Sequence, residues 1–315
     1  MKNLPLVSFG IVNCNRLFYL KSCLESLLAC TNDYPNKEIM IIDNASVESG
    51  TEEYLLEKER QGIRVFRQKE RDPANEFAIA LNLICREARG DFICPIQGDK
   101  QFTLRGGWLK EYVKFYSENM QNIGCMSFDA QRTVTNERTT FSEVYGNGDF
   151  KFTFDLRRYP ISGAGDVMFS RRIINMIYPW EEKNDAFEGG PDSETKMLKK
   201  TFNLIKEGNL NVGCAMPILP VSIAIYTDPR GTNARIRGNK RYGKYWESKD
   251  DFRYYQISDY RDMISKVEGR QAPLGIEDVV AAAGEWSLPI DEFGKWKKNP
   301  IRPETAKPGD YVVIS

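Results

Sequence analysis

The sequence predicts an α/β protein whose core is a doubly wound, mostly parallel β-sheet flanked by helices. The first sign is a set of short, continuous apolar runs, of which residues 39–42 (IMII) are the clearest. Strands of parallel sheets are buried on both faces and show such runs. The second sign is that these runs alternate with segments of helical periodicity. Strands and helices that alternate at this length favour right-handed crossovers and a single parallel layer covered by helices.

The first half of the chain supplies this alternation without interruption. Residues 6–12 (LVSFGIV) predict the first strand. A helix follows, and we expect its one-sided leucine stripe to lie in the core: Leu17, Leu20, Leu24, Leu27 and Leu28. The strand at 39–42 is followed by a helix at about 51–60 and a strand at 63–66.

The strand at 92–96 (FICPI) is preceded by a helix over 74–89, which ends at Gly90. Pro95 is unexpected there, because proline lacks one ladder donor and prefers sheet edges. The elements expected beyond this strand are a helix at 108–118, a strand at 123–128, a β-hairpin excursion within 129–160, an apolar strand at 167–169 and a helix from 194 to about 206. Residues after about 247 are polar and predict a helical appendage with an extended end at 311–314.

Composition favours a soluble, cytoplasmic protein. Forty-four basic residues balance forty-four acidic ones, so no overall field attracts nucleic acid or membrane. The seven cysteines form no Cys-x-x-Cys pair, which favours a reducing compartment. The amino terminus lacks the apolar core of a signal peptide. The longest apolar run, 212–226, is interrupted by two prolines and is shorter than the roughly 18 residues that span a bilayer.

The chain contains no histidine. This excludes Ser-His-Asp and Cys-His catalytic devices, imidazole acid–base chemistry and histidine ligation of a metal. Catalysis must then depend mainly on carboxylates, metal ions, lysines, tyrosines or a thiolate. If a metal takes part, hard oxygen ligands favour Mg²⁺ or Mn²⁺.

Three acidic residues stand where an α/β sheet binds its ligands. Asp43 and Asp99 each end an apolar run, and Gly98 allows the chain to turn just before Asp99. Asp192 follows in a Gly-Gly-Pro-Asp loop. Because the carboxyl ends of strands in open α/β sheets line the ligand crevice, we expect one site that includes all three.

The order of these motifs resembles that of the family 2 glycosyltransferases, which are inverting enzymes of the GT-A fold. Five segments over about residues 5–245 carry the resemblance: VSFGIVNCNR at the first strand, IIDNAS at the second, Asn82 followed by GDFI and a terminal aspartate, GDVMFSRR, and PDSE at a helix start. The resemblance implies a catalytic domain at 1–246 and a C-terminal appendage at 247–315. It also implies transfer of a sugar from a nucleotide-diphosphate donor, with a UDP-sugar favoured, to a hydroxyl on a glycan, lipid-linked or other acceptor.

The resemblance also assigns roles to residues. Asp43 would read the nucleoside, and the residues expected to bind the nucleotide sugar are Asn13, Asn15, Arg16, Asp43, Asn44, Asn82, Gln97, Gly98, Arg235 and Arg241. Asp99 would bind Mn²⁺ or Mg²⁺ and the diphosphate, with Asp228 in place of the histidine that the family often supplies. Gln97 stands where the family's motif has a second aspartate, which leaves the site one charge short.

Inversion by single displacement requires one base for the acceptor hydroxyl, and Asp192 is the candidate. Pro191 replaces the family's preceding glutamate, and Glu194 is interpreted as an acid of the first helical turn.

Alternatives remain open at this point. Gln97, Pro191 and the missing histidine also fit a module that binds nucleotide sugars or glycans without turnover. A nucleotidyltransferase would want a glycine-rich, lysine-bearing loop after the first strand, which residues 13–16 do not supply. The basic, aromatic cluster at 230–246 predicts a loop that closes over the diphosphate, a site for an anionic acceptor such as nucleic acid, or a solvated face. A glycosyltransferase that acts on a modified nucleic-acid base is the further alternative.

Overall fold

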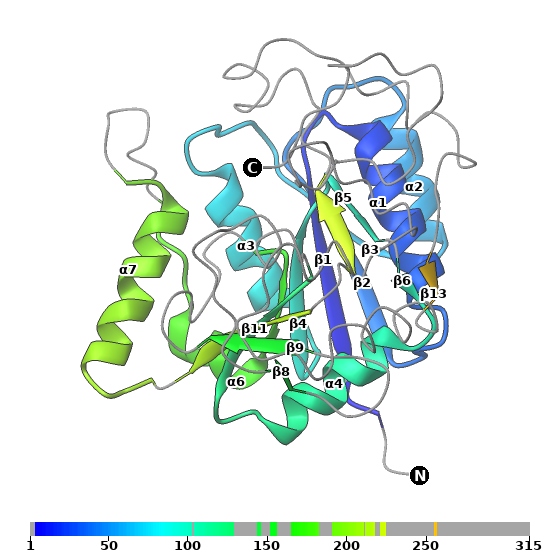
Figure 1. The fold of residues 1–315 in the computed structure, drawn as a ribbon. Coiled ribbons are helices and arrows are strands. Elements are labelled where there is room, and N and C mark those ends of the chain that lie inside the picture. Colours follow the sequence, from blue (N-terminus) through cyan, green and yellow to red (C-terminus); the bar gives the residue numbers. More distant parts are fainter. Residues whose placement is uncertain are drawn as a thin grey trace, which may run out of the picture.

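A computed structural model of the chain describes residues 4–102, 104–128, 144–145, 152–155, 165–182, 191–210, 212–217, 221–224 and 255–256. The helices are α1 (Leu17–Cys30), α2 (Thr51–Arg60), α3 (Glu76–Glu87), α4 (Trp108–Glu118), α6 (Arg171–Ile177) and α7 (Ser193–Lys206). Figure 1 shows α1 and α2 on one side of the central sheet and α3 on the other.

The central sheet has the strand order β3-β2-β1-β4-β10-β7-β11-β9-β8. Its strands are β1 (Val7–Asn13), β2 (Lys37–Asp43), β3 (Arg64–Arg67), β4 (Phe92–Gln97), β7 (Ile123–Ser127), β8 (Val144–Tyr145), β9 (Phe152–Asp155), β10 (Val167–Ser170) and β11 (Gly213–Pro217). Two short pairs lie outside it: β12 (Ser222–Ala224) with β5 (Lys100–Phe102), and β13 (Tyr255–Gln256) with β6 (Leu104–Arg105). The predicted α/β fold class is therefore confirmed.

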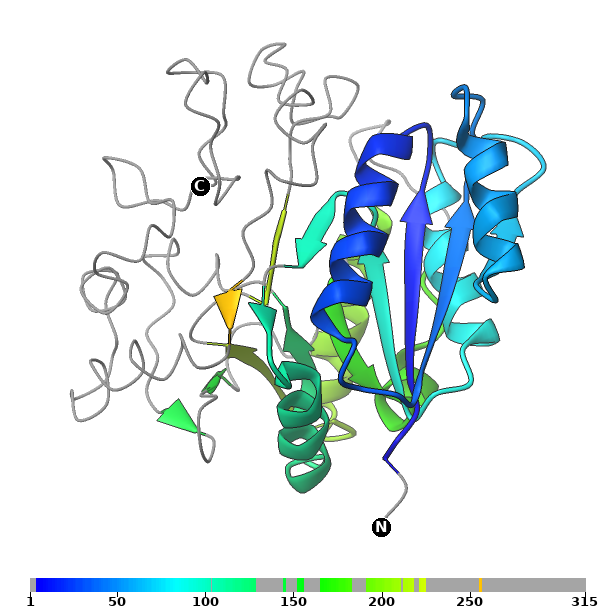
Figure 2. The same ribbon diagram turned by 90° about the vertical axis from the view of Figure 1, so that its right-hand side faces the viewer.

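Strands β1 to β4 form the parallel part of the sheet. From β1 the chain moves outward through β2 to β3, and then returns through α3 to place β4 on the other side of β1. This reversal is the topological switch point, where open α/β sheets bind ligands beyond the carboxyl ends of the strands. Figure 2 shows the arrows of β1 and β2 side by side and pointing the same way, so their carboxyl ends meet at one edge.

Burial follows the predicted pattern, with one exception. Alternating residues of β1 point to opposite faces of the sheet, yet nearly all of them are buried, as expected for a strand covered on both sides. In α1, Leu20, Leu24 and Leu27 are fully buried, but Leu28 is 39% exposed. Leu28 follows Leu27 directly, and consecutive helical residues point about 100° apart, so Leu28 leaves the core stripe.

Pro95 lies in a central strand, and its neighbours explain why it is tolerated. Strand β10 pairs with β4 only at Phe92 and Ile93. The Pro95 carbonyl points past the end of this pairing and accepts a hydrogen bond of 2.7 Å from the Asp166 amide. The backbone N and O of one strand residue point toward the same neighbouring strand. The amide hydrogen that Pro95 lacks would therefore point toward β10, beyond the last residue pair of the β4–β10 ladder.

The second half of the chain was predicted less completely. The hairpin within 129–160 is confirmed by the antiparallel β8–β9 pair, and the rest of that stretch lies outside the described residues. Strand β11, inside the apolar run at 212–226, was not predicted; it lies between β7 and β9. The expected extended end at 311–314 and the helical appendage after 247 lie outside the described residues.

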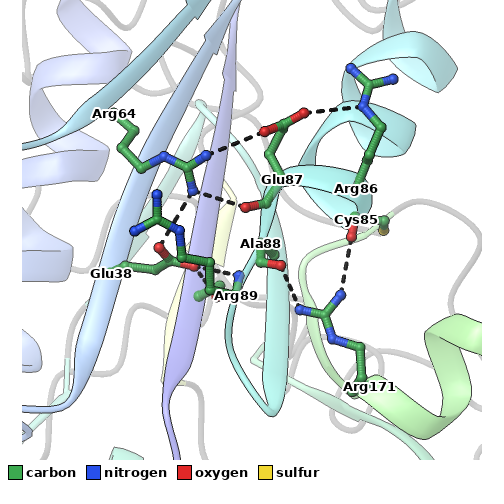
Figure 3. A network of polar contacts seen from close by, with 9 residues as sticks. Glu38, Arg64, Cys85, Arg86, Glu87, Ala88, Arg89 and Arg171 are labelled. Carbon is green, nitrogen blue, oxygen red and sulfur yellow. Dashed lines mark hydrogen bonds and ion pairs between the residues drawn. The ribbon is translucent and has the colours of Figure 1, made fainter.

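A set of polar contacts fastens the carboxyl end of α3 to the sheet, at the edge where β2 and β4 begin (Figure 3). Arg171 donates hydrogen bonds to the carbonyls of Cys85 (3.2 Å), Ala88 (2.6 Å) and Gly90 (2.9 Å). Arg64 pairs with Glu38 at 3.5 Å and with Glu87 at 3.3 Å. The carbonyls of Cys85 and Ala88 belong to the helix end, where carbonyls lack intrahelical partners, so Arg171 satisfies them.

None of the helices in the described part of the chain has the length and apolarity needed to cross a bilayer.

Candidate active site

Asn13 and Asp43 end β1 and β2 and face each other in register. The Asn13 Nδ2 donates a hydrogen bond of 2.7 Å to Asp43 Oδ1. Ser46 holds the same carboxylate twice, through its hydroxyl to Oδ1 (2.7 Å) and through its amide to Oδ2 (2.9 Å). Asp43 is 4% exposed and Asn13 is 2% exposed, so these contacts lie in a water-poor environment where they are strengthened.

Asn15 locks the loop after β1 to the loop after β2. Its side-chain oxygen accepts hydrogen bonds from the amides of Val47 (2.6 Å) and Glu48 (3.1 Å), and its own amide donates to Ser46 Oγ (2.8 Å). Asn15 has a φ of +50°, a left-handed conformation that asparagine tolerates better than most residues. Glu48 in turn accepts from the Leu17 amide at 2.7 Å, the first amide of α1. The two loops are therefore held in one arrangement.

Two buried acceptors beside this carboxylate have no partner among the described residues: the side-chain oxygens of Asn13 and Asn44. Both residues are 2% exposed. The Asn44 Nδ2 makes a long contact of 3.4 Å with the Glu76 carbonyl, which orients the amide. Buried polar atoms without partners cost free energy, so such an atom near a strand end indicates a ligand that supplies donors.

The carboxyl end of β4 lies beside this group. The Gly98 amide donates a hydrogen bond of 2.9 Å to the Val12 carbonyl, and a Cβ on Gly98 would stand 2.7 Å from that same oxygen. Only glycine allows this close approach. The turn delivers Asp99, whose carboxylate is 3.3 Å from the guanidinium of Arg16; the side chains are 12% and 31% exposed. The structure thus brings Arg16 and Asp99 together at the carboxyl end of β4.

Asp166 contacts the same turn from a different strand. Its Oδ1 accepts a hydrogen bond of 2.9 Å from the Gln97 amide, and its Oδ2 is 3.5 Å from the Lys100 ammonium. Gly165 and Asp166 have φ values of +80° and +57°, which direct the chain toward β4 just before β10 begins. The buried Lys100–Asp166 pair therefore fixes the backbone from which Asp99 projects.

The described residues do not by themselves fit a divalent cation. Asp99 already pairs with Arg16, and Gln97 offers an amide where the family's motif has a carboxylate. Within the described residues, no group of three or more Asp, Glu, Cys or His is arranged to hold a metal ion. Mg²⁺ takes about six oxygen ligands, and in proteins it is usually held by one or two carboxylates together with substrate phosphates and waters. Asp228, the predicted second ligand, lies outside the described residues.

Asp192 is half-buried and forms the N-cap of α7: its Oδ1 accepts a hydrogen bond of 2.7 Å from the Thr195 amide. An aspartate in this position satisfies one of the orphan amides of the helix and stabilises its start. This cap hydrogen bond uses one of the two carboxylate oxygens of Asp192.

The side chain of Asn82 binds the backbone of Trp180, and its Nδ2 also donates to Glu182 Oε1 at 3.1 Å. Binding of the nucleotide sugar by Asn82 stays a prediction. Arg235 and Arg241, the other predicted donor-binding residues, lie outside the described residues.

Cys14 lies between Asn13 and Asn15, and its thiol donates to the Asn44 carbonyl at 3.3 Å. Burial, together with the nearby Glu76 carboxylate, raises the pKa of this thiol to about 11. The six other cysteines are buried. At neutral pH Cys14 is therefore a neutral, weak donor rather than a nucleophile.

Sequence reasoning missed three residues that build the site: Ser46, Glu48 and Asp166. Ser46 follows Asp43 by three residues, a spacing at which a hydroxyl and an amide reach back to a carboxylate. A glycine before Asp166 is a turn signal that marks a change of chain direction. No sequence signal links Glu48 to the start of α1, because that contact depends on the tertiary fold.

A family model and one curated relative match parts of this chain. Residues 8–176, more than half of the chain, match the Glycosyl transferase family 2 profile. A curated relative, "Uncharacterized protein y4gI" of Sinorhizobium fredii, is 30% identical over 126 residues, which are 40% of this chain. The chain spans 13% of the length of that relative.

Among solved structures, S. aureus TarS in complex with UDP-GlcNAc is similar, with a TM-score of 0.45 and 16% identity over 67% of this chain and 58% of that chain. Mannosyltransferase PcManGT from Pyrobaculum calidifontis, in complex with GDP-Man and Mn²⁺, has a TM-score of 0.46 and 14% identity, over 91% of this chain and 71% of that chain. GalNAc-T7 with UDP, GalNAc and Mn²⁺ has a TM-score of 0.46 and 14% identity, over 70% of this chain and 44% of that chain. On the match to residues 8–176, the chain belongs to glycosyl transferase family 2, as a glycosyltransferase domain with a GT-A type α/β fold.

Proposed function

We propose that this protein is an inverting glycosyltransferase that moves a sugar from a nucleotide-diphosphate donor, with a UDP-sugar favoured, to an acceptor hydroxyl. The observation that carries the proposal is the buried Asn13–Asp43 pair at the switch point of the sheet, with unpartnered amide oxygens beside it. Residues 1–246 form the catalytic domain in this proposal, and residues 247–315 form an appendage.

The nucleoside fits the acceptors at the ends of β1 and β2. Asp43 and the side-chain oxygens of Asn13 and Asn44 accept hydrogen bonds only, so they match a ligand that presents several donors. A uridine supplies a base N–H and two ribose hydroxyls. Because Ser46 and Asn13 fix the Asp43 carboxylate beforehand, little ordering cost remains when the nucleoside binds.

The diphosphate is placed next to the β4 turn. Arg16 brings a guanidinium to this edge, and guanidinium groups bind phosphate oxygens in bidentate fashion. Arg235 and Arg241 are proposed to add positive charge from the 230–246 cluster. Binding of Mn²⁺ or Mg²⁺ by Asp99 and Asp228 stays a prediction, and none of the steps below depends on it.

The chemical step is a single displacement. The Asp192 carboxylate takes the proton of the acceptor hydroxyl, and the acceptor oxygen bonds to the anomeric carbon. The bond between that carbon and the diphosphate oxygen breaks, and its electron pair leaves with the nucleoside diphosphate. Attack opposite the leaving group inverts the anomeric centre. Asp192 lies outside the stretch that matches the family, so this role depends on its position at the start of α7.

A two-stage experiment tests the proposal. Nucleotide sugars are first screened by thermal shift, with and without Mn²⁺, because a ligand that binds only the folded state raises the melting temperature. The stabilising donor is then incubated with the protein, and free nucleoside diphosphate is measured over time. Catalytic release supports the enzyme. Stabilisation without release would assign the chain to the binding-module class, and an absence of stabilisation by every donor would contradict the site itself.

A further inference from the structure

Asn82, in the middle of α3, binds both backbone groups of a residue almost a hundred positions later in the chain. Its Oδ1 accepts a hydrogen bond of 2.8 Å from the Trp180 amide, and its Nδ2 donates one of 2.9 Å to the Trp180 carbonyl. Asn82 is 5% exposed and Trp180 is 1% exposed. The second Nδ2 hydrogen is used by Glu182 at 3.1 Å. Both amide hydrogens of Asn82 are therefore committed to residues 178–182, which we call the Trp180 segment.

Helix α7 holds the Trp180 segment from the other side. Lys196 pairs with Glu181 at 2.6 Å. Lys200, one helical turn later, donates to the carbonyls of Ile177 (2.6 Å) and Pro179 (3.3 Å). Burial lowers the pKa of Lys200, as expected for an ammonium with less access to water. Residues at positions i and i+4 lie on one face of a helix, so Lys196 and Lys200 both contact the Trp180 segment from the same face of α7.

The start of α7 is Asp192, one turn before Lys196. The Lys196 amide donates to the Asp192 carbonyl at 3.0 Å, and the Thr195 amide donates to the Asp192 carboxylate. Ser193 in the first turn and Met197 at the start of the second are 3% and 2% exposed and pack into the protein. A continuous set of contacts thus runs from Asn82 through the Trp180 segment and the lysines of α7 to Asp192.

We propose that Asn82 is a positioning residue that sets the place of Asp192 through the Trp180 segment. The proposal rests on the role of Asp192 as the base given above. The Asn82 side chain offers one donor and one acceptor to the backbone of Trp180, as the backbone of a neighbouring strand would. Aspartate loses both donors and adds a charge that faces Glu182, and alanine loses all three hydrogen bonds.

The first test compares Asn82→Ala and Asn82→Asp with a matched control, Arg171→Met. Arg171 holds the carboxyl end of α3 by hydrogen bonds to carbonyls, and among the described residues its side chain bonds neither to the Trp180 segment nor to α7. The Asn82 variants are expected to lower kcat by about 10²-fold, because misplacing a catalytic group by about 1 Å has this effect. The Kd of the donor is expected to stay unchanged. Equal losses of kcat in Arg171→Met, measured at a temperature where each variant is folded, would overturn the proposal.

The second test asks whether Asn82 acts through Asp192. If it does, Asn82→Ala combined with Asp192→Asn is no slower than Asp192→Asn alone, because the group being positioned is already gone. A double variant in which the two losses multiply would show that Asn82 acts independently of Asp192 and would overturn the inference.

A third readout needs no acceptor and no turnover. Asn82→Ala and Asn82→Asp are expected to speed amide hydrogen exchange at Thr195 and Lys196, whose amides bond to Asp192, whereas Arg171→Met leaves that exchange as in the wild type. Unchanged exchange at the start of α7 in both Asn82 variants would overturn the inference. If the wild type releases no nucleoside diphosphate, the proposed function fails while this exchange test still decides the positioning role.

Discussion

Asn13 donates a hydrogen bond of 2.7 Å to Asp43, which joins the last residues of two adjacent parallel strands. The contact holds the Asp43 carboxylate, which can only accept hydrogen bonds, at the edge of the sheet that contains the topological switch point. Ser46 completes the arrangement by binding both oxygens of Asp43. The nucleoside site of this proposal is therefore built before a ligand arrives, from one strand-end amide and one strand-end acid.

Replacing Asp43 tests that site. In Asp43→Ala the nucleoside loses its acceptor while Asn13 and Ser46 lose theirs, so binding of the free nucleoside diphosphate is expected to weaken by about 1–3 kcal/mol. Isothermal calorimetry measures the change directly. A fall in melting temperature with unchanged affinity would mean that Asp43 serves only the turn after β2.

Ser46→Ala is the matched control for Asp43→Ala. It removes the hydroxyl that orients the carboxylate but leaves the carboxylate itself and the Ser46 amide contact. We expect an affinity loss smaller than that of Asp43→Ala, because the acceptor is still present and only its pre-organisation is weakened.

Cys14 provides a chemical probe of the same site. With its pKa raised to about 11 by burial, only about one thiol in a thousand is ionised at pH 8. A folded-state pKa above the usual value of about 8.5 means that the alkylation rate keeps rising about tenfold per pH unit from pH 8 to pH 10 instead of levelling off near pH 9. Nucleoside diphosphate is expected to slow the reaction, because Cys14 lies between Asn13 and Asn15.

Iodoacetamide labelling followed by mass spectrometry measures this rate residue by residue, and Cys14→Ser gives the background from the six buried cysteines. A rate that reaches its plateau by pH 9 would contradict the raised pKa.

The sequence predicted the parallel half of the fold well because its signals are local. The apolar run at 39–42 predicts a buried strand and residues 51–60 predict a helix, each from neighbouring residues alone. The structure has β2 and α2 at these positions. The strand-end positions of Asp43 and Asp99 follow from the same local signals. Strand β11 escaped prediction because its place between β7 and β9 depends on partners distant in the sequence.

The contacts of the site depend even more on tertiary structure. Nothing local to Asn82 shows that its amide meets Trp180, and the resemblance alone had placed it at the donor. Asp166 reaches Gln97 only because β10 returns antiparallel to β4. Sequence reasoning therefore located the edge of the sheet that forms the site, but not the set of residues that hold it in place.

Asp99 tests the predicted role of a divalent cation. Asp99→Asn keeps the shape of the side chain but removes the charge that a cation or the Arg16 guanidinium requires. We expect any increase in donor affinity caused by Mn²⁺ to disappear in this variant. Arg16→Met is the comparison variant: it lowers donor affinity by removing a proposed diphosphate contact, but it leaves the Asp99 carboxylate, so the increase in affinity caused by Mn²⁺ should persist. If Mn²⁺ strengthens donor binding equally in Asp99→Asn and the wild type, Asp99 is not the metal ligand.

Asp192 allows a test of chemistry that leaves the helix intact. Asparagine is as good an N-cap as aspartate, so Asp192→Asn keeps the 2.7 Å bond from the Thr195 amide and the start of α7. It cannot take up the acceptor's proton. Transfer is therefore expected to slow by at least about 10²-fold while the Kd of the donor stays unchanged, which single-turnover kinetics and calorimetry measure separately. Glu194→Gln is the matched control in the same helical turn and should turn over near the wild-type rate. If Glu194→Gln shows the large loss and Asp192→Asn does not, the base is Glu194, and the N-cap is the whole role of Asp192.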